Sequence, residues 1–264
     1  MSTFLHDFVN QIDEKWSEVD LLISKAKEVQ EENQSLYNAL CRSVTVLIVA
    51  HLEGFTKDLV KSIVHDLNRE LSFDQLPTAI KRTYCFNYLG RNFGSNDKKF
   101  EQKISKLIDK FDEVNCEISQ EPFLSAVNRN PNPEIIHTIF KNFGIEDVFA
   151  LLHESDLDNV FSDTISVTKA KIEILKNEIK DEILSFPYTF DKSKYNLVKS
   201  AYQQNTMWQE FLDQINQKRH LVAHGSEFEN LDDAAELEER KAKVVLLQFG
   251  LIGILSNFIV SKIR

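Results

Sequence analysis

A nearly continuous apolar segment, residues 244–260, limits what this chain can fold into. Its polar interruptions are Gln248, Ser256 and Asn257, and lysines precede and follow it. The segment is only marginally long enough to cross a bilayer, and polar residues inside a membrane span are costly. A helix that is apolar on all sides is also typical of the buried centre of a bundle or dimer. We therefore favour a buried core helix and expect no membrane span.

Scarcity of turn-forming residues favours an all-α fold. The 264 residues include only 7 glycines and 5 prolines, which favours long helices over a β fold with many turns. Apolar residues at helical spacing predict one long surface helix over residues 4–32. A second helix is predicted from a cap at Ser35 to about Leu71, with an apolar middle at 44–50. Pro77 opens a third helical region.

The middle of the chain differs from these long helices. Residues 116–134 are rich in proline and asparagine and break regular structure. A short helix is predicted to follow over residues 134–143 and to stop at Gly144. We expect one helical domain, residues 1–264, built from long antiparallel helices with a small and mostly helical insert module at about 116–163.

Charge and cysteine content exclude some functional classes. The formal net charge of −10 repels phosphates, so the chain is not a general nucleic-acid coat, although a local basic site is compatible with it. Cys41, Cys85 and Cys116 are widely spaced and form no disulfide or metal-knuckle pattern. Residues 1–15 contain acids and no apolar core of a signal peptide. We expect a cytoplasmic protein.

Residues 81–110 combine basic and aromatic side chains. Such a mixture suits single-stranded nucleic acid, because bases stack on rings while phosphates pair with cations. The alternative is an amphipathic helix with a solvated lysine face, which the spacing also fits. The candidate RNA-binding residues are Lys81, Arg82, Arg91, Lys98 and Lys99. The interleaved aromatic residues are Tyr84, Phe86, Tyr88, Phe93 and Phe100.

The strongest chemical signal lies at the end of a helix that is predicted to begin at Lys192 or later and to stop at Gly225. Arg219 supplies a fixed positive fork for phosphate oxygens, and His224 can transfer a proton near neutral pH. On an ideal helix these two positions are separated by about 140° around the axis. Either the last turn is loosened, or a second copy of the chain completes the site across a twofold axis.

Glu53 is a candidate supporting residue. It follows the apolar middle of the predicted second helix. A carboxylate buried there is costly unless it is paired with a cation, and the alternative is that it reaches solvent. We expect Arg219 as the partner, with Arg42 and Lys57 as alternatives. A purely structural interpretation of the motif also stays open: Arg219 pairs with an acid and His224 caps the helix end.

A metal site is the other alternative. His220 and His224 are four residues apart on one helical face, as in zinc-binding histidine pairs. The metalloprotease version needs a glutamate directly after the first histidine, where this chain has Leu221. No clear third ligand follows, although Glu227 and Glu229 are near. We expect neither a metal nor another cofactor.

The string Arg219-His220-Leu-Val-Ala-His224-Gly resembles the motif of the HEPN superfamily of all-α nucleases. In that motif an arginine is followed by four to six residues, the first of them polar, and then by a histidine at the end of a bundle helix. The string is similar to the form found in bacterial HEPN-like nucleases of the MAE type. Residues 42–55 and residues 132–145 also look like blocks of that subfamily, in the same order.

The resemblance implies a metal-independent endoribonuclease that acts as a toxin or antiphage effector. It implies a homodimer with both motifs lining one cleft, an RNA substrate, and an antitoxin or defence-system partner protein. His224 would act as general acid or base, Arg219 would hold the phosphate, and His220 would orient the pair or bind a neighbouring phosphate. The tyrosine that some relatives modify is Ser226 here. The alternative is a non-catalytic helical module that binds RNA, nucleotide or a protein partner.

Overall fold

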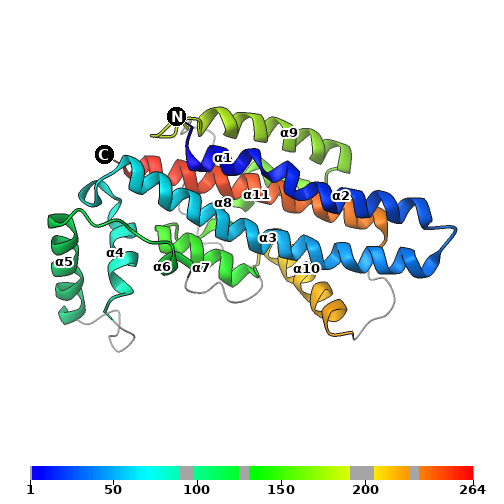
Figure 1. Ribbon diagram of the computed structural model, residues 1–264, viewed down its shortest axis with the longest axis horizontal. Helices are drawn as coiled ribbons and strands as arrows, with labels where there is room; N and C mark the ends of the chain where they lie inside the picture. The colour runs from blue at the N-terminus through cyan, green and yellow to red at the C-terminus, as the bar shows by residue number, and fades with distance from the viewer. Residues whose placement is uncertain (1, 90–97, 125–130, 191–204, 226–231, 264) are drawn as a thin grey trace.

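Helices make up the regular structure of the chain. This computed structural model describes residues 2–89, 98–124, 131–190, 205–225 and 232–263. No strand occurs in these ranges, which confirms the predicted all-α fold. The helices in Figure 1 are α1 (Phe4–Asn10), α2 (Ile12–Val29), α3 (Gln34–Glu70), α4 (Thr78–Phe86), α5 (Lys98–Glu113), α6 (Glu121–Leu124), α7 (Pro133–Phe143), α8 (Val148–His153), α9 (Ile165–Glu182), α10 (Met207–Ala223) and α11 (Ala234–Lys262), with the 3-10 helices η1 (Phe73–Gln75) and η2 (Asp156–Phe161).

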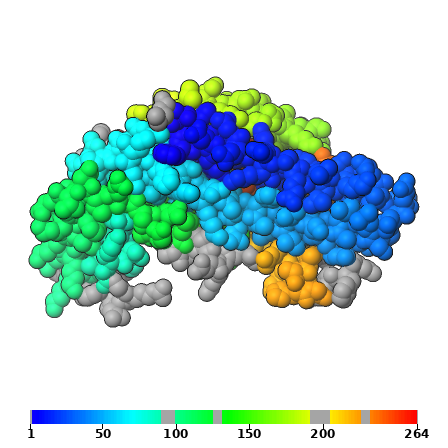
Figure 2. All heavy atoms as spheres, viewed as in Figure 1, coloured from blue at the N-terminus to red at the C-terminus, as the bar shows by residue number. Residues whose placement is uncertain are grey.

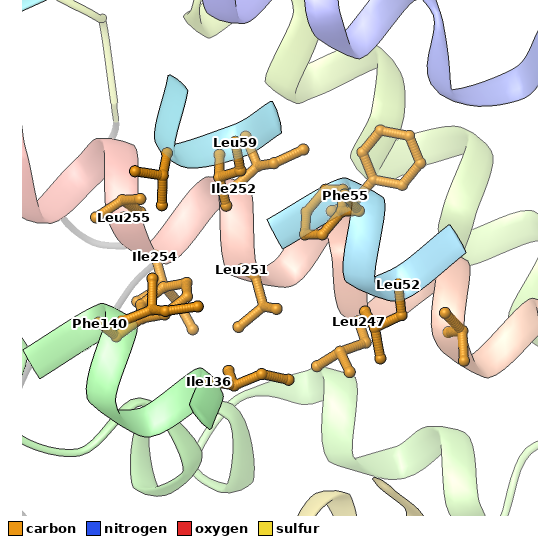
Figure 3. Close-up of a cluster of buried hydrophobic side chains, with 14 of the residues drawn as sticks. Leu52, Phe55, Leu59, Ile136, Phe140, Leu247, Leu251, Ile252, Ile254 and Leu255 are labelled. Carbon is orange, nitrogen blue, oxygen red and sulfur yellow. The ribbon is translucent and has the colours of Figure 1, made fainter. Parts of the chain in front are cut away.

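The apolar segment 244–260 lies within α11, at the centre of the molecule. Helix α11 packs against α9, α3 and α2, and Leu246, Phe249 and Leu251 are fully buried. The buried-core interpretation of this segment is therefore confirmed. Figure 3 shows the three layers that meet here, with Leu247, Leu251 and Leu255 of α11 near Leu52, Phe55 and Leu59 of α3 and Ile136 and Phe140 of α7.

Helices α3 and α11 differ in how far the rest of the chain covers them. Within the described residues, both are long and apolar enough to cross a membrane by length and composition alone. The most apolar stretch of α11 is 83% buried, but that of α3 is only 39% buried. Helices α1, α2, α10 and α11 contact α3, and Figure 2 shows the other side of α3 uncovered along its middle.

The predicted first long helix is divided into α1 and α2 at Gln11, so that prediction was wrong. The carboxylate of Asp66 in α3 is fully buried and accepts hydrogen bonds from the backbone N–H groups of Phe4 (2.8 Å) and Leu5 (3.0 Å). The hydroxyl of Tyr188 donates a third (2.8 Å). These bonds fix the start of α1 on α3, and the chain turns at Gln11 before α2 runs along α3.

Helix boundaries follow the capping residues. Helix α3 is capped by Asn33, whose side chain accepts from the N–H of Leu36 (3.0 Å), rather than by the predicted Ser35. Ser35 is already the second residue of the helix, whereas Asn33 directly precedes it, at the position from which a side-chain oxygen can accept from the free N–H groups of the first turn. Helix α4 begins directly after Pro77, and α7 stops at Gly144, which adopts φ 104°. Both of these predictions are confirmed.

Helix α10 is held by contacts from several parts of the chain. The segment 116–163, which we interpret from the sequence as an insert, contains α6, α7, α8 and η2. Of these, α7, α8 and η2 contact α10, and α3 contacts it as well. In Figure 1, the C-terminal end of α10 extends away from the long helices. The residues at that end are therefore placed outside the core.

Candidate active site at the end of helix α10

Local sequence explains where α10 starts and which face it buries. Thr206 caps the helix in a reciprocal arrangement with Gln209, whose side chain accepts from the N–H of Thr206 (2.9 Å). Four residues of its first half are buried at helical spacing, so this half is fixed against the body of the protein. These residues are Trp208, Phe211, Leu212 and Ile215.

The last turn of α10 is regular and mostly exposed. His220 and His224 are exposed, and Arg219 is partly buried. The N–H of His224 donates to the carbonyl of His220 (3.0 Å), as in an intact helix, and Gly225 follows with φ 64°. A loosened last turn, one of our two explanations for the spacing of Arg219 and His224, is therefore wrong.

Arg219 and His224 point to different sides of α10. Arg219 lies on the face of Leu212 and Ile215, because residues four and seven apart share a helical face. His224 is about 140° away from it around the axis. Arg219 makes no hydrogen bond or ion pair with any described residue. The purely structural interpretation had two parts: that Arg219 pairs with an acid and that His224 caps the helix end. Within the described residues only the second part holds, because His224 occupies the C-cap position.

His220 and His224 lie against each other. Their ring centroids are 4.2 Å apart and the planes are inclined by 49°. Among the described residues, no third histidine, cysteine or acid joins them in a group that could hold a metal ion. Glu227 and Glu229 lie outside the described residues. The two rings form one exposed imidazole pair, and the partly buried Arg219 lies on a different face of α10.

A buried ionic cluster fixes the end of α10 to the start of α11. Asp232 has a fully buried side chain and contacts the ammonium group of Lys218 and the guanidinium of Arg240 (2.8 Å). Two residues further on, the N–H of Ala234 donates to the hydroxyl of Tyr37 in α3 (3.1 Å). Lys218 precedes Arg219 directly. The cluster therefore joins Lys218, just before the Arg–His motif, to Asp232, after it. The sequence did not predict this contact.

Comparison with known proteins decides the family. The model of the RiboL-PSP-HEPN family matches residues 10–249. The chain belongs to this HEPN family. The match confirms the superfamily that the motif resembles, and it specifies nothing about the MAE type. No curated protein and no solved structure matches the chain. A HEPN domain indicates a nuclease or RNA-binding role, and such domains typically bind RNA and form dimers.

Glu53 does not pair with the arginine of the HEPN motif. Its carboxylate contacts the ammonium group of Lys57 (2.7 Å), one turn further along α3. A partner four residues away on the same helix is available without any tertiary contact, which explains the outcome. The expected pairing with Arg219 was wrong, and one of the two alternatives, Lys57, is the partner.

Two of the candidate RNA-binding residues are engaged in contacts within the HEPN domain. Lys81 is buried, and its ammonium group donates to the carbonyl of Asp74 (2.8 Å) and to the carboxylate of Asp112 (3.0 Å). Its assignment to RNA is therefore wrong, because its ammonium group is already bound by these two acceptors within the fold. Arg82 forms two hydrogen bonds with Glu101 (2.8 and 2.7 Å), although both side chains remain exposed.

The structure says less about the other members of this basic group. Arg91 lies outside the described residues, as does the side chain of Lys98. Lys99 is exposed on α5. The neighbouring Tyr84 and Phe100 are buried, whereas Phe86 and Tyr88 are exposed. Two of the aromatic residues named with this basic group are therefore part of the core, and two lie at the surface.

A polar cleft lies further back along α10, between this helix and the start of α7. It is lined by Asn132, Glu134 and His137 at the start of α7 and by Gln209 and Asp213 of α10. Burial raises the pKa of Asp213. Steps of four, four, three and four residues place Gln209, Asp213, Gln217, His220 and His224 on one face of the helix. That spacing was present in the sequence and could have revealed the polar face.

Proposed function

We propose that this HEPN protein is a metal-independent endoribonuclease whose active site contains Arg219, His220 and His224. The observation that carries the proposal is the placement of all three at the projecting end of α10, with the imidazoles exposed and the arginine without an acidic partner among the described residues. An arginine paired with an acid would serve the fold. An arginine held near the surface without one is suited to a phosphate.

The proposed reaction uses the ribose 2′-hydroxyl of the substrate. Its oxygen attacks the adjacent phosphorus, the bond from phosphorus to the 5′-oxygen breaks, and the products are a 2′,3′-cyclic phosphate and a 5′-hydroxyl end. The 2′-hydroxyl loses a proton and the leaving 5′-oxygen gains one; His224 carries out one of these two transfers, and water carries out the other. Arg219 stabilises the charge that grows on the phosphate oxygens, and His220 orients His224 through the ring contact.

A second copy of the chain completes the proposed site. Because the last turn of α10 is regular, Arg219 and His224 of one chain diverge by about 140° around the helix axis. Two chains related by a twofold axis can place the arginine of one beside the histidine of the other. We infer a homodimer in which two such pairs line one cleft.

The net charge of −10 supports a selective role for this nuclease. An acidic surface repels bulk RNA, so access depends on a specific substrate or on a protein partner. We propose that the enzyme acts as a toxin or antiphage effector in the cytoplasm and that a partner, such as an antitoxin, controls it.

The proposed chemistry makes a direct prediction about the substrate. The protein is incubated with total cellular RNA in excess EDTA, and a cleaved site is mapped and transferred to an oligonucleotide. Cleavage in EDTA is expected to match cleavage without it. A single 2′-deoxyribose at the mapped site is expected to abolish cutting there, because the attacking oxygen is missing.

A matched oligonucleotide with the deoxyribose three positions away is the control and should be cut normally. Cleavage of the deoxy-substituted site, or complete loss of activity in EDTA, would contradict the mechanism. If RNA is bound but never cut by the wild-type protein, the non-catalytic RNA-binding alternative is correct.

A further inference from the structure

The polar cleft between α10 and the start of α7 has no role in the proposed reaction. Its volume is about 460 Å³, which lies within the range of sites that hold small organic groups. Most of the side chains that line it are polar, and they come from both helices. The cleft therefore offers hydrogen bonds, rather than an apolar surface, to a group that enters it.

Hydrogen bonds fix both walls of the cleft and orient its two amide side chains. The side chain of Asn216 in α10 donates to the carbonyl of Pro131 (3.2 Å), which directly precedes Asn132. The side-chain oxygens of Asn132 and Gln209 each accept from a backbone N–H at the start of their own helix (2.9 Å in both cases). An amide whose oxygen is engaged in this way keeps its NH₂ group as a donor. No described residue accepts from either NH₂ group, so both can donate to a ligand.

Three further side chains of the cleft, those of Glu134, His137 and Asp213, make no hydrogen bond or ion pair with any described residue. Within the described ranges, they also form no group that could hold a metal ion. Carboxylates without a cationic partner repel a phosphate, so the cleft is unsuited to the RNA backbone. They accept hydrogen bonds from a neutral group that carries N–H donors. A nucleobase is such a group.

The cleft is aligned with the histidines of the motif. Asp213 lies on the same face of α10 as His220 and His224. At 1.5 Å per residue, the two histidines are about 10 and 16 Å further along the helix axis. A stacked strand advances about 3.4 Å per nucleotide, so these distances correspond to about three to five nucleotides, and to fewer in an extended strand. An RNA strand that lies along this face can therefore place one of its bases in the cleft.

Guanine matches the groups in the cleft best. Its Watson–Crick edge carries two adjacent donors, N1–H and the N2 amino group, and the two oxygens of one carboxylate can accept from both. Its O6 and N7 are neighbouring acceptors that suit amide NH₂ groups. Adenine, cytosine and uracil each carry a single donor group on the Watson–Crick edge, so they would leave part of the carboxylate without a partner.

We propose that this cleft binds a guanine of the RNA within about five nucleotides of the cleaved phosphate. Asp213 accepts from N1–H and the N2 amino group, and the amides of Asn132 and Gln209 donate to O6 and N7. The inference rests on the proposed function, since it names a base that the same nuclease selects. It makes Asp213 a specificity-determining residue, and RNA binding tests it without any cleavage.

The first test measures binding alone. Short uridine oligonucleotides with methylated 2′-oxygens carry one central guanosine, inosine or 7-deazaguanosine, and fluorescence anisotropy gives the Kd of each. Inosine lacks the N2 amino group, and 7-deazaguanosine lacks N7. Guanosine is expected to bind roughly 5- to 150-fold more tightly than inosine, which is the range of one bidentate base contact, and more tightly than 7-deazaguanosine. Asp213→Asn should abolish the preference for guanosine over inosine.

Glu210→Gln is the matched control. It removes the same charge one residue away, from an exposed position on a different face of α10. A general rise in RNA affinity from the lost negative charge should appear in both variants, but only Asp213→Asn should lose the preference for guanosine. Circular dichroism must show the same helicity for the wild type and both variants. Equal Kd values for guanosine and either analogue in the wild type, or a preference over inosine that survives Asp213→Asn, would overturn the inference.

Mapping of the cut sites in total cellular RNA separates this inference from the proposed function. The wild type is expected to cut where guanine occupies one fixed position near the cut, and Asp213→Asn should lose that preference. Cleavage without a fixed guanine overturns the inference and leaves the nuclease standing. Guanosine-dependent binding without cleavage supports the cleft and contradicts the nuclease. If Asp213→Asn keeps the RNA preference but weakens binding of an oligolysine peptide, the inference is overturned and the cleft is assigned to a cationic partner.

Discussion

Alanine at either Arg219 or His224 is expected to lower the rate of RNA cleavage by roughly 10²- to 10⁴-fold, which is the range typical of removing a general acid or base or a donor to a charged transition state. Both side chains lie at the projecting end of α10 and make no hydrogen bond with the core. Their loss should therefore leave the fold intact. The measurement is single-turnover cleavage of a mapped RNA oligonucleotide, with thermal unfolding recorded for each variant.

The control for these variants is His65→Ala, which removes an exposed histidine of α3 and is expected to leave the rate unchanged. His220→Ala should have a smaller effect than His224→Ala, because we assign it an orienting role. If toxicity and cleavage survive both Arg219→Ala and His224→Ala, the enzyme hypothesis is wrong.

Asp232→Ala is expected to lower the free energy of unfolding by about 3 kcal/mol, because it leaves two partly buried cations without their shared carboxylate. The side chains of Lys218 and Arg240 are 25% and 19% exposed, so solvent compensates for only part of the loss. Because Lys218 precedes Arg219, the change should also loosen the motif. Chemical denaturation measures the first effect, and cleavage well below the unfolding temperature measures the second.

The matched control is Asp20→Ala, which removes the carboxylate from an exposed ion pair with Lys241 (2.5 Å). Its side chain is 58% exposed, and the expected change is below about 1 kcal/mol. Equal effects of Asp20→Ala and Asp232→Ala on stability would show that the buried cluster does not fix the end of α10.

Much of the helical framework could be predicted because its signals are local. The apolar run of α11, the glycine that ends α7 and the proline before α4 each act within a few residues of the boundary they set. The division at Gln11 could not be predicted in this way. It accompanies the contact between Asp66 and the start of α1, and these residues are far apart in the sequence.

The position of the candidate site was predictable, but the partners of charged residues were not. The Arg–His spacing, the helix end and the glycine after it are all visible in the sequence, and the angle between Arg219 and His224 follows from a regular helix. In contrast, Lys81 looks like a solvated cation in the sequence, and only the packing of α5 shows that it pairs with Asp112. Asp232 belongs to an acidic stretch whose sequence is typical of a solvated loop. Only the structure shows that its carboxylate is buried between Lys218 and Arg240.

Mixing the two inactive variants tests most directly whether the active site is built from two chains. Purified Arg219→Ala and His224→Ala proteins are combined under conditions that allow subunit exchange, and RNA cleavage is measured. In a mixed dimer, one composite site contains an intact arginine from one chain and an intact histidine from the other. Random exchange is therefore expected to restore about a quarter of the wild-type activity. If the exchanged mixture is as inactive as each variant alone, each site lies within one chain and the account of a composite site is contradicted.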